Sequence, residues 1–458
     1  MKIVERQRVN EQDSVIRSKN FEEVSLGFDE ETMLIEAERC LGCKTAPCEK
    51  GCPVGVKIPD FIKALKDGDP LKANEIIKET NSLPAVCGRV CPQEIQCEQL
   101  CVRKNKLGGS VAIGALERYA ADAALKANVK PVKPTKKLDL KVAVVGSGPA
   151  GLSCAGELAM NGAQVTVFEA FHKAGGVLVY GIPEFRLPKS IVEKEIDSLK
   201  ELGVKFKLNT VIGKTFYLEE LLDEYDYVFI GSGAGLPVFM NIKGENLNGV
   251  YSANEFLTRV NLMKAYKEDS VTPIQRGNVV AVVGAGNVAM DAARTALRLG
   301  AQKVYIVYRR SRQEMPARED EIEHAEQEGI EFRLLTNPVE ILGKEKVEGI
   351  RCIKMELGEP DQSGRRRPVP IQGSEYDLPC DQVIMSIGTS PNPLIKNSAK
   401  ELKTSKWGTL EVDDNLLTSI DRVYAGGDAV TGSATVILAM GAGRKAARHM
   451  LQKYAERE

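Results

Sequence analysis

The chain has 458 residues, 43% of them hydrophobic and 27% charged, and its formal net charge is −1. This length suits about three domains, and the balanced charge excludes a strongly basic surface for nucleic acid or an anionic membrane. Because the sequence shows no apolar signal-peptide segment and no run of about 20 apolar residues, we expect a cytoplasmic protein without a membrane span.

The first part of the chain is predicted to form short helices between loops that carry cysteine. Residues 59–64 and 71–78 have helical patterns, and Ser110 is a suitable N-cap for a helix over residues 111–125. A segment rich in lysine and proline follows at residues 130–137. Its composition predicts a domain boundary.

Beyond this linker the pattern changes to alternating strands and helices. The strands expected in two successive units are residues 141–145 and 165–169, then 279–283 and 304–308. Each unit has a βαβ pattern, which predicts a parallel sheet. A further strand is expected at residues 383–388, and residues 423–448 are expected to form a strand followed by a loop or helix.

The first unit contains the pattern G-x-G-x-x-G between its first strand and its helix, and Glu169 closes the next strand. The fingerprint residues are Gly146, Gly148, Pro149, Ala150 and Gly151. The glycines allow the backbone to approach a pyrophosphate, whose charge the N-terminus of the helix stabilises. The carboxylate of Glu169 is placed to accept hydrogen bonds from a ribose diol, so we expect this unit to bind a dinucleotide.

The second unit has alanine in the third small position of its fingerprint, which this fold permits. The fingerprint residues here are Gly284, Gly286 and Asn287. The partner strand ends at Tyr308 and is followed by Arg309 and Arg310, with no acid at the ribose position. Guanidinium groups bind phosphate in a bidentate way, so this site is predicted to favour NADPH over NADH.

Two dinucleotide sites in one chain require two ligands, and FAD and NADPH are the natural pair for hydride chemistry. The sequence YAGGD at residues 424–428 supports FAD at the first site, since Asp428 would reach the ribityl hydroxyls. Thr435 and Val436 then begin a helix facing the flavin. This pairing ties the C-terminal segment to the first unit.

Eight of the eleven cysteines lie between Cys40 and Cys101. The spacings are C-x2-C-x4-C-x3-C-P from Cys40 and C-x3-C-P-x4-C-x3-C from Cys87. In a reducing compartment such clusters bind metal more often than they form disulfides, and the Cys-Pro step in each run is typical of ferredoxin-type iron–sulfur loops. Structural zinc is the alternative, since it also uses thiolates, but C-x4-C-x3-C-P fits it poorly.

Three longer motifs point to a known family. They are VCGRVCP at residues 86–92, AIGALERY at residues 112–119 and YGIPEFRLPK at residues 180–189. With them the chain resembles, over nearly its whole length, the small (beta) subunit of NADPH-dependent glutamate synthase. It is similar as well to the large subunit of NADH-dependent ferredoxin:NADP oxidoreductase and to the N-terminal half of dihydropyrimidine dehydrogenase.

The resemblance implies an α/β fold: a helical N-terminal iron–sulfur domain followed by two Rossmann-like nucleotide-binding domains of the disulfide-oxidoreductase type. The domains expected are an iron–sulfur domain at residues 1–135, an FAD-binding domain at residues 136–275 and 390–458, and an NADPH-binding domain at residues 276–389 inserted between the two FAD segments.

The resemblance also implies two interleaved [4Fe–4S] clusters. One would be held by Cys40, Cys43, Cys48 and Cys101, and the other by Cys52, Cys91, Cys97 and Glu117. Cys87 would then be a spare cysteine. From spacing alone Cys87 is the expected ligand and Glu117 a solvated acid, so this assignment rests on the resemblance.

The family further suggests residues around each nucleotide. Gly176, Leu178 and Arg186 would line the FAD, where Arg186 would stabilise negative charge on the reduced flavin, the one catalytic role expected of a side chain. The residues expected around NADPH are Asn287, Asp291, Arg309, Arg310, Ser386 and Gly388.

The function implied is that of an electron-transfer flavoprotein subunit that moves electrons between NADP(H), FAD, two clusters and a partner subunit. That partner is either the FMN-containing synthase subunit of glutamate synthase or a ferredoxin-reductase-like flavoprotein subunit of an electron-bifurcating oxidoreductase. A disulfide reductase is excluded because no Cys-x-x-Cys lies between Cys154 and Cys352. A non-enzymatic, zinc-stabilised binding module is the alternative of a different class, and the two fingerprints argue against it.

Overall fold

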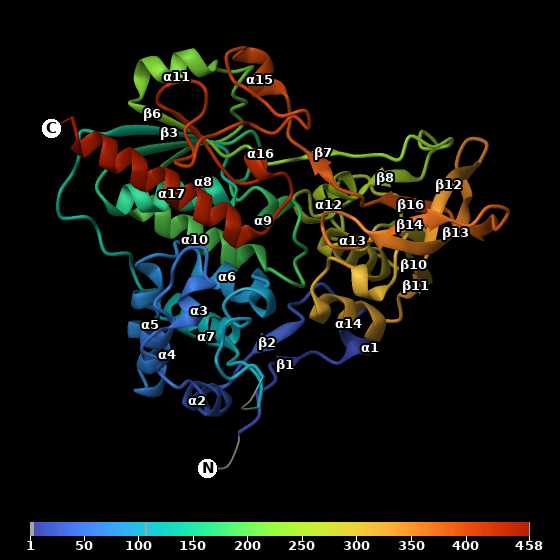
Figure 1. Ribbon diagram of the computed structural model, residues 1–458, viewed down its shortest axis with the longest axis horizontal. Coiled ribbons are helices and arrows are strands. Elements are labelled where there is room, and N and C mark those ends of the chain that lie inside the picture. The colour runs from blue at the N-terminus through green and yellow to red at the C-terminus, as the bar shows by residue number, and fades with distance from the viewer. Residues whose placement is uncertain (1–3, 106–107, 458) are drawn as a thin grey trace.

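The computed structural model describes residues 4–105 and 108–457. Three parts are visible in Figure 1: a helical N-terminal part in blue, a unit that combines green segments with the red C-terminal helix, and a unit of yellow and orange elements. The two units with sheets lie side by side, and the helical part packs below the first of them.

Short helices separated by cysteine-bearing loops build the N-terminal part, as the sequence predicted. They are α2 (Glu30–Glu38), α3 (Pro47–Lys50), α4 (Ile58–Lys66), α5 (Pro70–Lys78), α6 (Pro84–Val90), the 3₁₀ turn η1 (Gln93–Ile95) and α7 (Ile113–Lys126). Helices α3 to α6 each carry proline in the first turn, where its missing N–H costs no hydrogen bond. The helices predicted over residues 59–64 and 71–78 are α4 and α5.

The expected cap of α7 was wrong. Ser110 does not cap this helix; its N-cap is Ala112. The backbone N–H of Ala112 donates to Oε1 of Glu36 on α2 at 2.7 Å, and the hydroxyl of Ser110 accepts from Arg6 at 3.0 Å. The carboxylate of Glu36, from another helix, therefore accepts from a backbone N–H at the start of α7, where the sequence pattern predicted the hydroxyl of Ser110 as the cap.

The first sheet is entirely parallel. Its strands, in order, are β18 (Val423–Ala425), β6 (Tyr227–Ile230), β3 (Lys141–Val145), β4 (Gln164–Phe168) and β5 (Lys205–Lys207). The elements around it are α8 (Pro149–Met160), α9 (Val177–Tyr180), α10 (Lys189–Glu201), α11 (Leu218–Glu224), α15 (Leu394–Ser398), α16 (Asp428–Thr431) and α17 (Val436–Ala455). Strand β18 confirms that the C-terminal segment belongs to the first unit.

The second sheet is parallel too. Its strands, in order, are β11 (Glu331–Arg333), β10 (Lys303–Val307), β9 (Val279–Val283), β16 (Gln382–Met385) and β8 (Val250–Ser252). Its helical elements are α12 (Ala253–Asn261), α13 (Asn287–Arg298), η2 (Arg312–Glu314) and α14 (Glu319–Gln327). An antiparallel extension comprises β12 (Thr336–Gly343), β13 (Val347–Pro360), β14 (Arg366–Pro370) and β15 (Tyr376–Pro379).

The predicted boundary at residues 275/276 needs correction. Strand β8 and helix α12 precede it, yet β8 pairs with β16 in the second sheet. The chain passes between the units where β7 (Leu236–Pro237) pairs with β17 (Thr389–Ser390). The second unit therefore begins near β7. Strand β8 has three residues, too few to show a period in the sequence.

One continuous hydrophobic core joins the N-terminal part to the first unit. It runs from Phe61 and Leu116 in the helical part to Leu152 on α8 and Met440 on α17. The second unit has separate cores on either side of its sheet. The helical part and the first unit therefore form one rigid body, because close-packed interiors resist relative motion.

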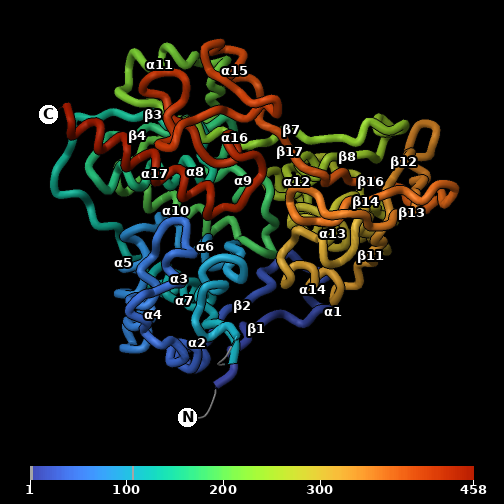
Figure 2. The backbone as a smooth tube through the Cα atoms, viewed as in Figure 1, coloured from blue at the N-terminus to red at the C-terminus, as the bar shows by residue number. Residues whose placement is uncertain are grey.

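An N-terminal segment reaches from the helical part to the second unit, as Figure 2 shows. It includes β1 (Asn10–Glu11), α1 (Ser14–Arg17) and β2 (Ser25–Gly27). Arg17 on α1 donates to Glu328, which follows α14, at 3.2 Å. The phenyl ring of Phe21 stacks on Tyr266 with ring centres 4.3 Å apart. This segment is a bridge between the two bodies.

Candidate functional site

The first fingerprint forms the turn from β3 into α8. Gly146 has a φ of 97°, and a side chain there would meet a backbone carbonyl at 2.5 Å. A side chain at Gly151 would lie 2.0 Å from the carbonyl oxygen of Gly146. Gly148 is the N-cap of α8, and a Cβ there would have no described atom within 4 Å. The helix, which begins with Pro149 and Ala150, thus presents its N-terminus to an open space that suits a pyrophosphate.

Glu169 lies buried directly after β4. Its Oε2 accepts hydrogen bonds from the backbone N–H and the hydroxyl of Ser147, at 3.0 and 2.5 Å. The same hydroxyl accepts from the N–H of Gly175 at 2.9 Å. These bonds fix the carboxylate beside the fingerprint turn, where its remaining lone pairs suit a ribose diol. Ser147 occupies a variable position of the fingerprint, so no sequence pattern marked it.

The C-terminal residues predicted for the flavin are Asp428, Thr435 and Val436. Gly427 precedes them with a φ of 67°, and a Cβ there would lie 3.0 Å from that of Ala150. Burial raises the pKa of Asp428. Thr435 caps α17, which starts at Val436. The structure therefore brings this segment against the first fingerprint, as expected.

Gly176 lies against the same turn. Its φ is 53°, and a Cβ there would meet the Cα of Gly148 at 2.7 Å. Leu178, two residues later on α9, is completely buried. Any side chain at Gly176 would intrude on the backbone that is to receive the pyrophosphate.

The second fingerprint repeats this construction between β9 and α13. Gly284 has a φ of 130°, and a Cβ there would lie 2.2 Å from the carbonyl oxygen of Ser386. Gly286 is the N-cap of α13. The side chain of Asn287 accepts from the backbone N–H of Arg318 at 3.0 Å. Gly388, with a φ of 119°, faces open space. These predicted residues therefore share the carboxyl edge of the second sheet.

The two arginines predicted to bind the 2′-phosphate differ in their surroundings. Arg309 is exposed at the end of β10. Arg310 is buried, donating to Oδ2 of Asp361 at 2.7 Å and to the carbonyl of Arg366 at 2.8 Å. The structure thus leaves Arg309 accessible and gives Arg310 a partner on the β13–β14 hairpin.

Arg186 lies between the two units. Its Nη1 donates to both carboxylate oxygens of Asp291 on α13, at 2.9 and 2.8 Å, and its Nε pairs with Glu321 on α14 at 2.8 Å. Burial alone would raise the pKa of Glu321, but Arg186 and Arg294 lower it to about 2. The structure assigns Arg186 an ionic link between the units, and the flavin-facing role expected of it stays a prediction. No motif marked Glu321.

Four half-exposed cysteines surround a small cavity in the N-terminal part: Cys40, Cys43, Cys48 and Cys101. Burial raises the pKa of the Cys48 thiol to about 12, and the nearby sulfurs of Cys40 and Cys101 add to the rise. The grouping is the one implied for the first cluster, including the distant Cys101. Four thiols around a cavity are the donor set of a [4Fe–4S] cluster.

The second group is more deeply buried. Burial raises the pKa of Cys52 to about 11 and also raises that of Cys97, while a hydrogen bond with Cys87 is the main cause of the raised pKa of Cys91. The charge of Glu117 raises the pKa of all three ligand candidates. The structure therefore places Glu117 among these cysteines.

Glu117 is itself 8% exposed. Burial raises its pKa to about 8, although Nδ2 of Asn81 donates to its Oε1 at 2.8 Å. The sulfur of Cys87 lies 3.6 Å from Oδ1 of Asn81 and 3.5 Å from the sulfur of Met440. Asn81 therefore contacts both candidates for the fourth ligand, and no motif predicted it.

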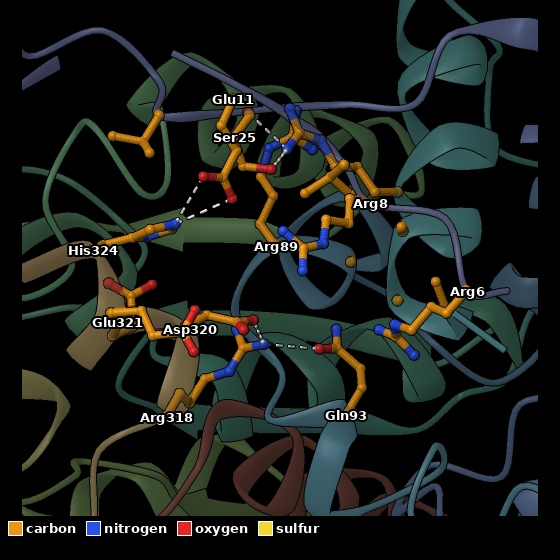
Figure 3. A pocket seen from close by; sticks show the side chains of 18 of the residues that line it. Arg6, Arg8, Glu11, Ser25, Arg89, Gln93, Arg318, Asp320, Glu321 and His324 are labelled. Atoms are coloured by element: carbon orange, nitrogen blue, oxygen red, sulfur yellow. Dashed lines mark hydrogen bonds and ion pairs between the residues drawn. The ribbon is translucent and has the colours of Figure 1, made fainter. Parts of the chain in front are cut away.

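A polar cavity of about 710 Å³ lies between the N-terminal part and the second unit. Figure 3 shows Arg318, Glu321 and His324 on one side of it and Arg6 on the other. Its charged groups are largely paired: His324 contacts Glu11 at 3.1 Å and Arg6 pairs with Glu98 at 2.7 Å. The His324–Glu11 contact joins the second unit to the N-terminal part beside this polar cavity, whereas the first unit shares an apolar core with the N-terminal part.

Comparisons with known proteins match both halves of this architecture. Residues 17–129 match the family "dihydropyrimidine dehydrogenase domain II, 4Fe-4S cluster", and residues 140–443 match "pyridine nucleotide-disulphide oxidoreductase". The glutamate synthase [NADPH] small chain of Escherichia coli K12 is 38% identical over 442 residues, covering 94% of this chain and 93% of that protein. The chain belongs to the glutamate synthase small-chain family.

Relatives of this family also occur in other enzymes. The beta subunit of the NADP(+)-dependent formate dehydrogenase of Moorella thermoacetica is 41% identical over 429 residues, covering 88% of this chain and 59% of that one. Among solved structures, FprA of Mycobacterium tuberculosis aligns with a TM-score of 0.59 at 22% identity, over 69% of this chain and 85% of FprA. The last match concerns the fold alone.

These comparisons confirm several expectations. The fold is the one predicted, and the chain is an NADPH-dependent oxidoreductase whose cofactor classes are 4Fe–4S, FAD and NADP(H). In the part of the chain that the structure describes, no helix is long and apolar enough to cross a membrane. The individual site residues stay predictions.

Proposed function

We propose that the chain is the electron-transfer subunit of a larger enzyme, linking NADP(H) through FAD and two [4Fe–4S] clusters to a partner subunit of the glutamate synthase type. The observation that carries this proposal is the single core shared by the cysteine-bearing helices and the first nucleotide-binding unit. Electron transfer needs fixed distances between redox groups, and a continuous core supplies them.

The depth of burial suggests an order for the two cysteine groups. Cys91 and Cys97 are buried, and their neighbour Cys87 contacts Met440 on α17. Since α17 begins beside the first fingerprint, the second group is the one next to the flavin site. Cys40 and Cys43 belong to the half-exposed group, which we assign to the exchange with a partner.

The surface beside the first group supports this assignment. Leu41 and Val102 line the same small cavity as the four cysteines and are about half exposed, at 51% and 52%. Contiguous exposed apolar surface is a feature of protein interaction sites. We propose that the partner subunit contacts this region.

The chain's own residues bind and orient rather than react. The N-termini of α8 and α13 hold the two pyrophosphates, Glu169 receives the ribose of the flavin nucleotide, and Arg309 is the accessible cation for a 2′-phosphate. When bound, NADPH would supply a hydride, FAD would accept its two electrons and proton, and the clusters would take the electrons one at a time. No side-chain nucleophile or general base is required.

The proposal is tested by anaerobic purification from the native source, with partner identification and counts of flavin and iron. Co-purification of a large FMN-containing synthase subunit supports the glutamate synthase type. Recovery with a small ferredoxin-reductase-like flavoprotein subunit would instead support an electron-bifurcating ferredoxin:NADP oxidoreductase. A chain that binds nucleotides but contains no iron would contradict both.

A further inference from the structure

Helix α17 connects the flavin-binding unit to the second cysteine group. It packs along α8, where a Cβ at Gly443 would lie 2.0 Å from the carbonyl oxygen of Ala150. Another face of α17 meets the loop that follows Cys52, where a Cβ at Gly441 would lie 2.9 Å from the carbonyl oxygen of Pro53. One helix therefore contacts both the fingerprint and the cysteine loop at backbone distance.

Arg444 makes the polar part of this contact. Its Nε donates to Oε2 of Glu157 on α8 at 2.9 Å, and its Nη1 donates to the carbonyl oxygen of Val54 at 2.5 Å. The side chain is 9% exposed, so both bonds form away from bulk water, where charge-assisted bonds are strong. The arginine thus fixes one peptide group of the cysteine loop to the helix of the first fingerprint.

The preceding peptide group, between Pro53 and Val54, lies next to the sulfur of Cys52. The backbone N–H groups of Val54 and Val56 donate hydrogen bonds to this sulfur. Val54 therefore has its carbonyl held by Arg444 while its N–H faces Cys52. Hydrogen bonds to the sulfurs of a cluster help to set its reduction potential.

We propose that Arg444 is a positioning residue for the second cluster, which holds the Cys52 loop so that its N–H groups stay directed at the ligand sulfur. This inference rests on the proposed function, because it takes Cys52 as a ligand of a cluster next to the flavin. Groups that orient metal ligands from outside commonly change metal affinity or activity by about 10- to 100-fold when removed.

The test uses the full chain, purified or reconstituted anaerobically with FAD and clusters. Arg444→Met removes both bonds. Gly441→Ala perturbs the same loop without changing Arg444, placing a methyl group against Pro53 while favouring the helix. The matched control is Arg448→Met: Arg448 donates to the other oxygen of Glu157 at 2.9 Å but is 59% exposed, and within the described residues Glu157 is the one hydrogen-bond partner of its side chain.

Three readouts separate this inference from the proposed function. In Arg444→Met we expect NADPH to reduce the flavin at a rate within about twofold of the unsubstituted chain. One of the two cluster signals in electron paramagnetic resonance should change, with a more negative midpoint potential because fewer N–H groups stabilise the added electron. The iron of the second cluster, which is half of the total, should pass to a chelator about tenfold faster than in the unsubstituted chain. Arg448→Met should leave all three unchanged, and Arg444→Lys should restore part of the potential.

Unchanged cluster signals and iron release in FAD-containing Arg444→Met would overturn the inference. If that variant does not retain FAD, Gly441→Ala decides in the same way. Clusters that NADPH cannot reduce in the unsubstituted chain would instead contradict the proposed function, while the iron release of Arg444→Met would still test the inference.

Discussion

Asp291 on α13 accepts two hydrogen bonds from Nη1 of Arg186, at 2.9 and 2.8 Å, across the boundary between the two nucleotide-binding units. Glu321 holds Nε of the same arginine at 2.8 Å. These groups are buried, and the cavity between the second unit and the N-terminal part is polar. Buried ion pairs therefore contribute to the contact between the two units.

Loss of Asp291 should destabilise the protein. In Asp291→Ala, the buried guanidinium of Arg186 keeps its pair with Glu321 but loses both hydrogen bonds to Asp291. Breaking a buried ion pair in this way typically lowers the free energy of unfolding by about 3 kcal/mol. Urea unfolding followed by circular dichroism measures the change. The control is Glu331→Gln, which breaks an exposed pair with Lys303, and we expect no measurable effect there. Equal effects of the two substitutions would contradict a structural role for the buried pair.

Arg309 should carry the preference for NADPH. We expect Arg309→Ala to lower kcat/KM for NADPH about tenfold or more, since a charge-assisted bond to phosphate is lost, and to leave kcat/KM for NADH unchanged. Steady-state reduction of an artificial acceptor measures both. The control is Arg351→Ala, since Arg351 pairs with Asp377 on the antiparallel extension. Comparable rates with both nucleotides in the unsubstituted chain would disprove the preference.

Glu117 and Cys87 can be distinguished as ligands. If Glu117 completes the second cluster, Glu117→Ala will alter or remove the resonance signal of one cluster, whereas Cys87→Ala will keep both clusters. Iron and sulfide analysis with electron paramagnetic resonance checks each variant. The reverse pattern would make Cys87 the ligand and restore the assignment that spacing alone favours.

Acid should weaken the second unit. Burial alone would raise the pKa of Glu328, but Arg298 and Arg294 lower it to about 2, against an ordinary 4.5. Between these values the unfolded chain binds a proton that the folded chain does not, so stability falls as pH falls from about 4.5 to about 2. Glu328→Gln should reduce this slope and lower the free energy of unfolding at neutral pH. An unchanged slope would mean that the carboxylate titrates normally.

Sequence patterns predicted the elements whose cause is local. The strands at residues 141–145 and 279–283 have the predicted bounds, because buried apolar runs that end in glycine leave little choice. The glycine turns, Glu169 and the C-terminal Asp428 followed from the same local logic. The places of these residues in the fold could therefore be predicted from the sequence.

Long-range partners account for what the patterns missed. The prediction that Ser110 caps α7 was wrong, because Glu36 on another helix accepts the hydrogen bond from the backbone N–H of Ala112. Arg310 is occupied by Asp361, which lies on a hairpin about 50 residues later. Arg444 contacts a loop near the other end of the chain. Such contacts depend on how elements pack, which no short motif records.

The most direct test of the account is the iron, zinc and flavin content of the anaerobically purified chain, followed by addition of NADPH under electron paramagnetic resonance. We expect about eight iron atoms and one FAD per chain, with cluster signals that develop on addition of NADPH. Near-zero iron with stoichiometric zinc, or clusters that stay oxidised while the flavin is reduced, would contradict it.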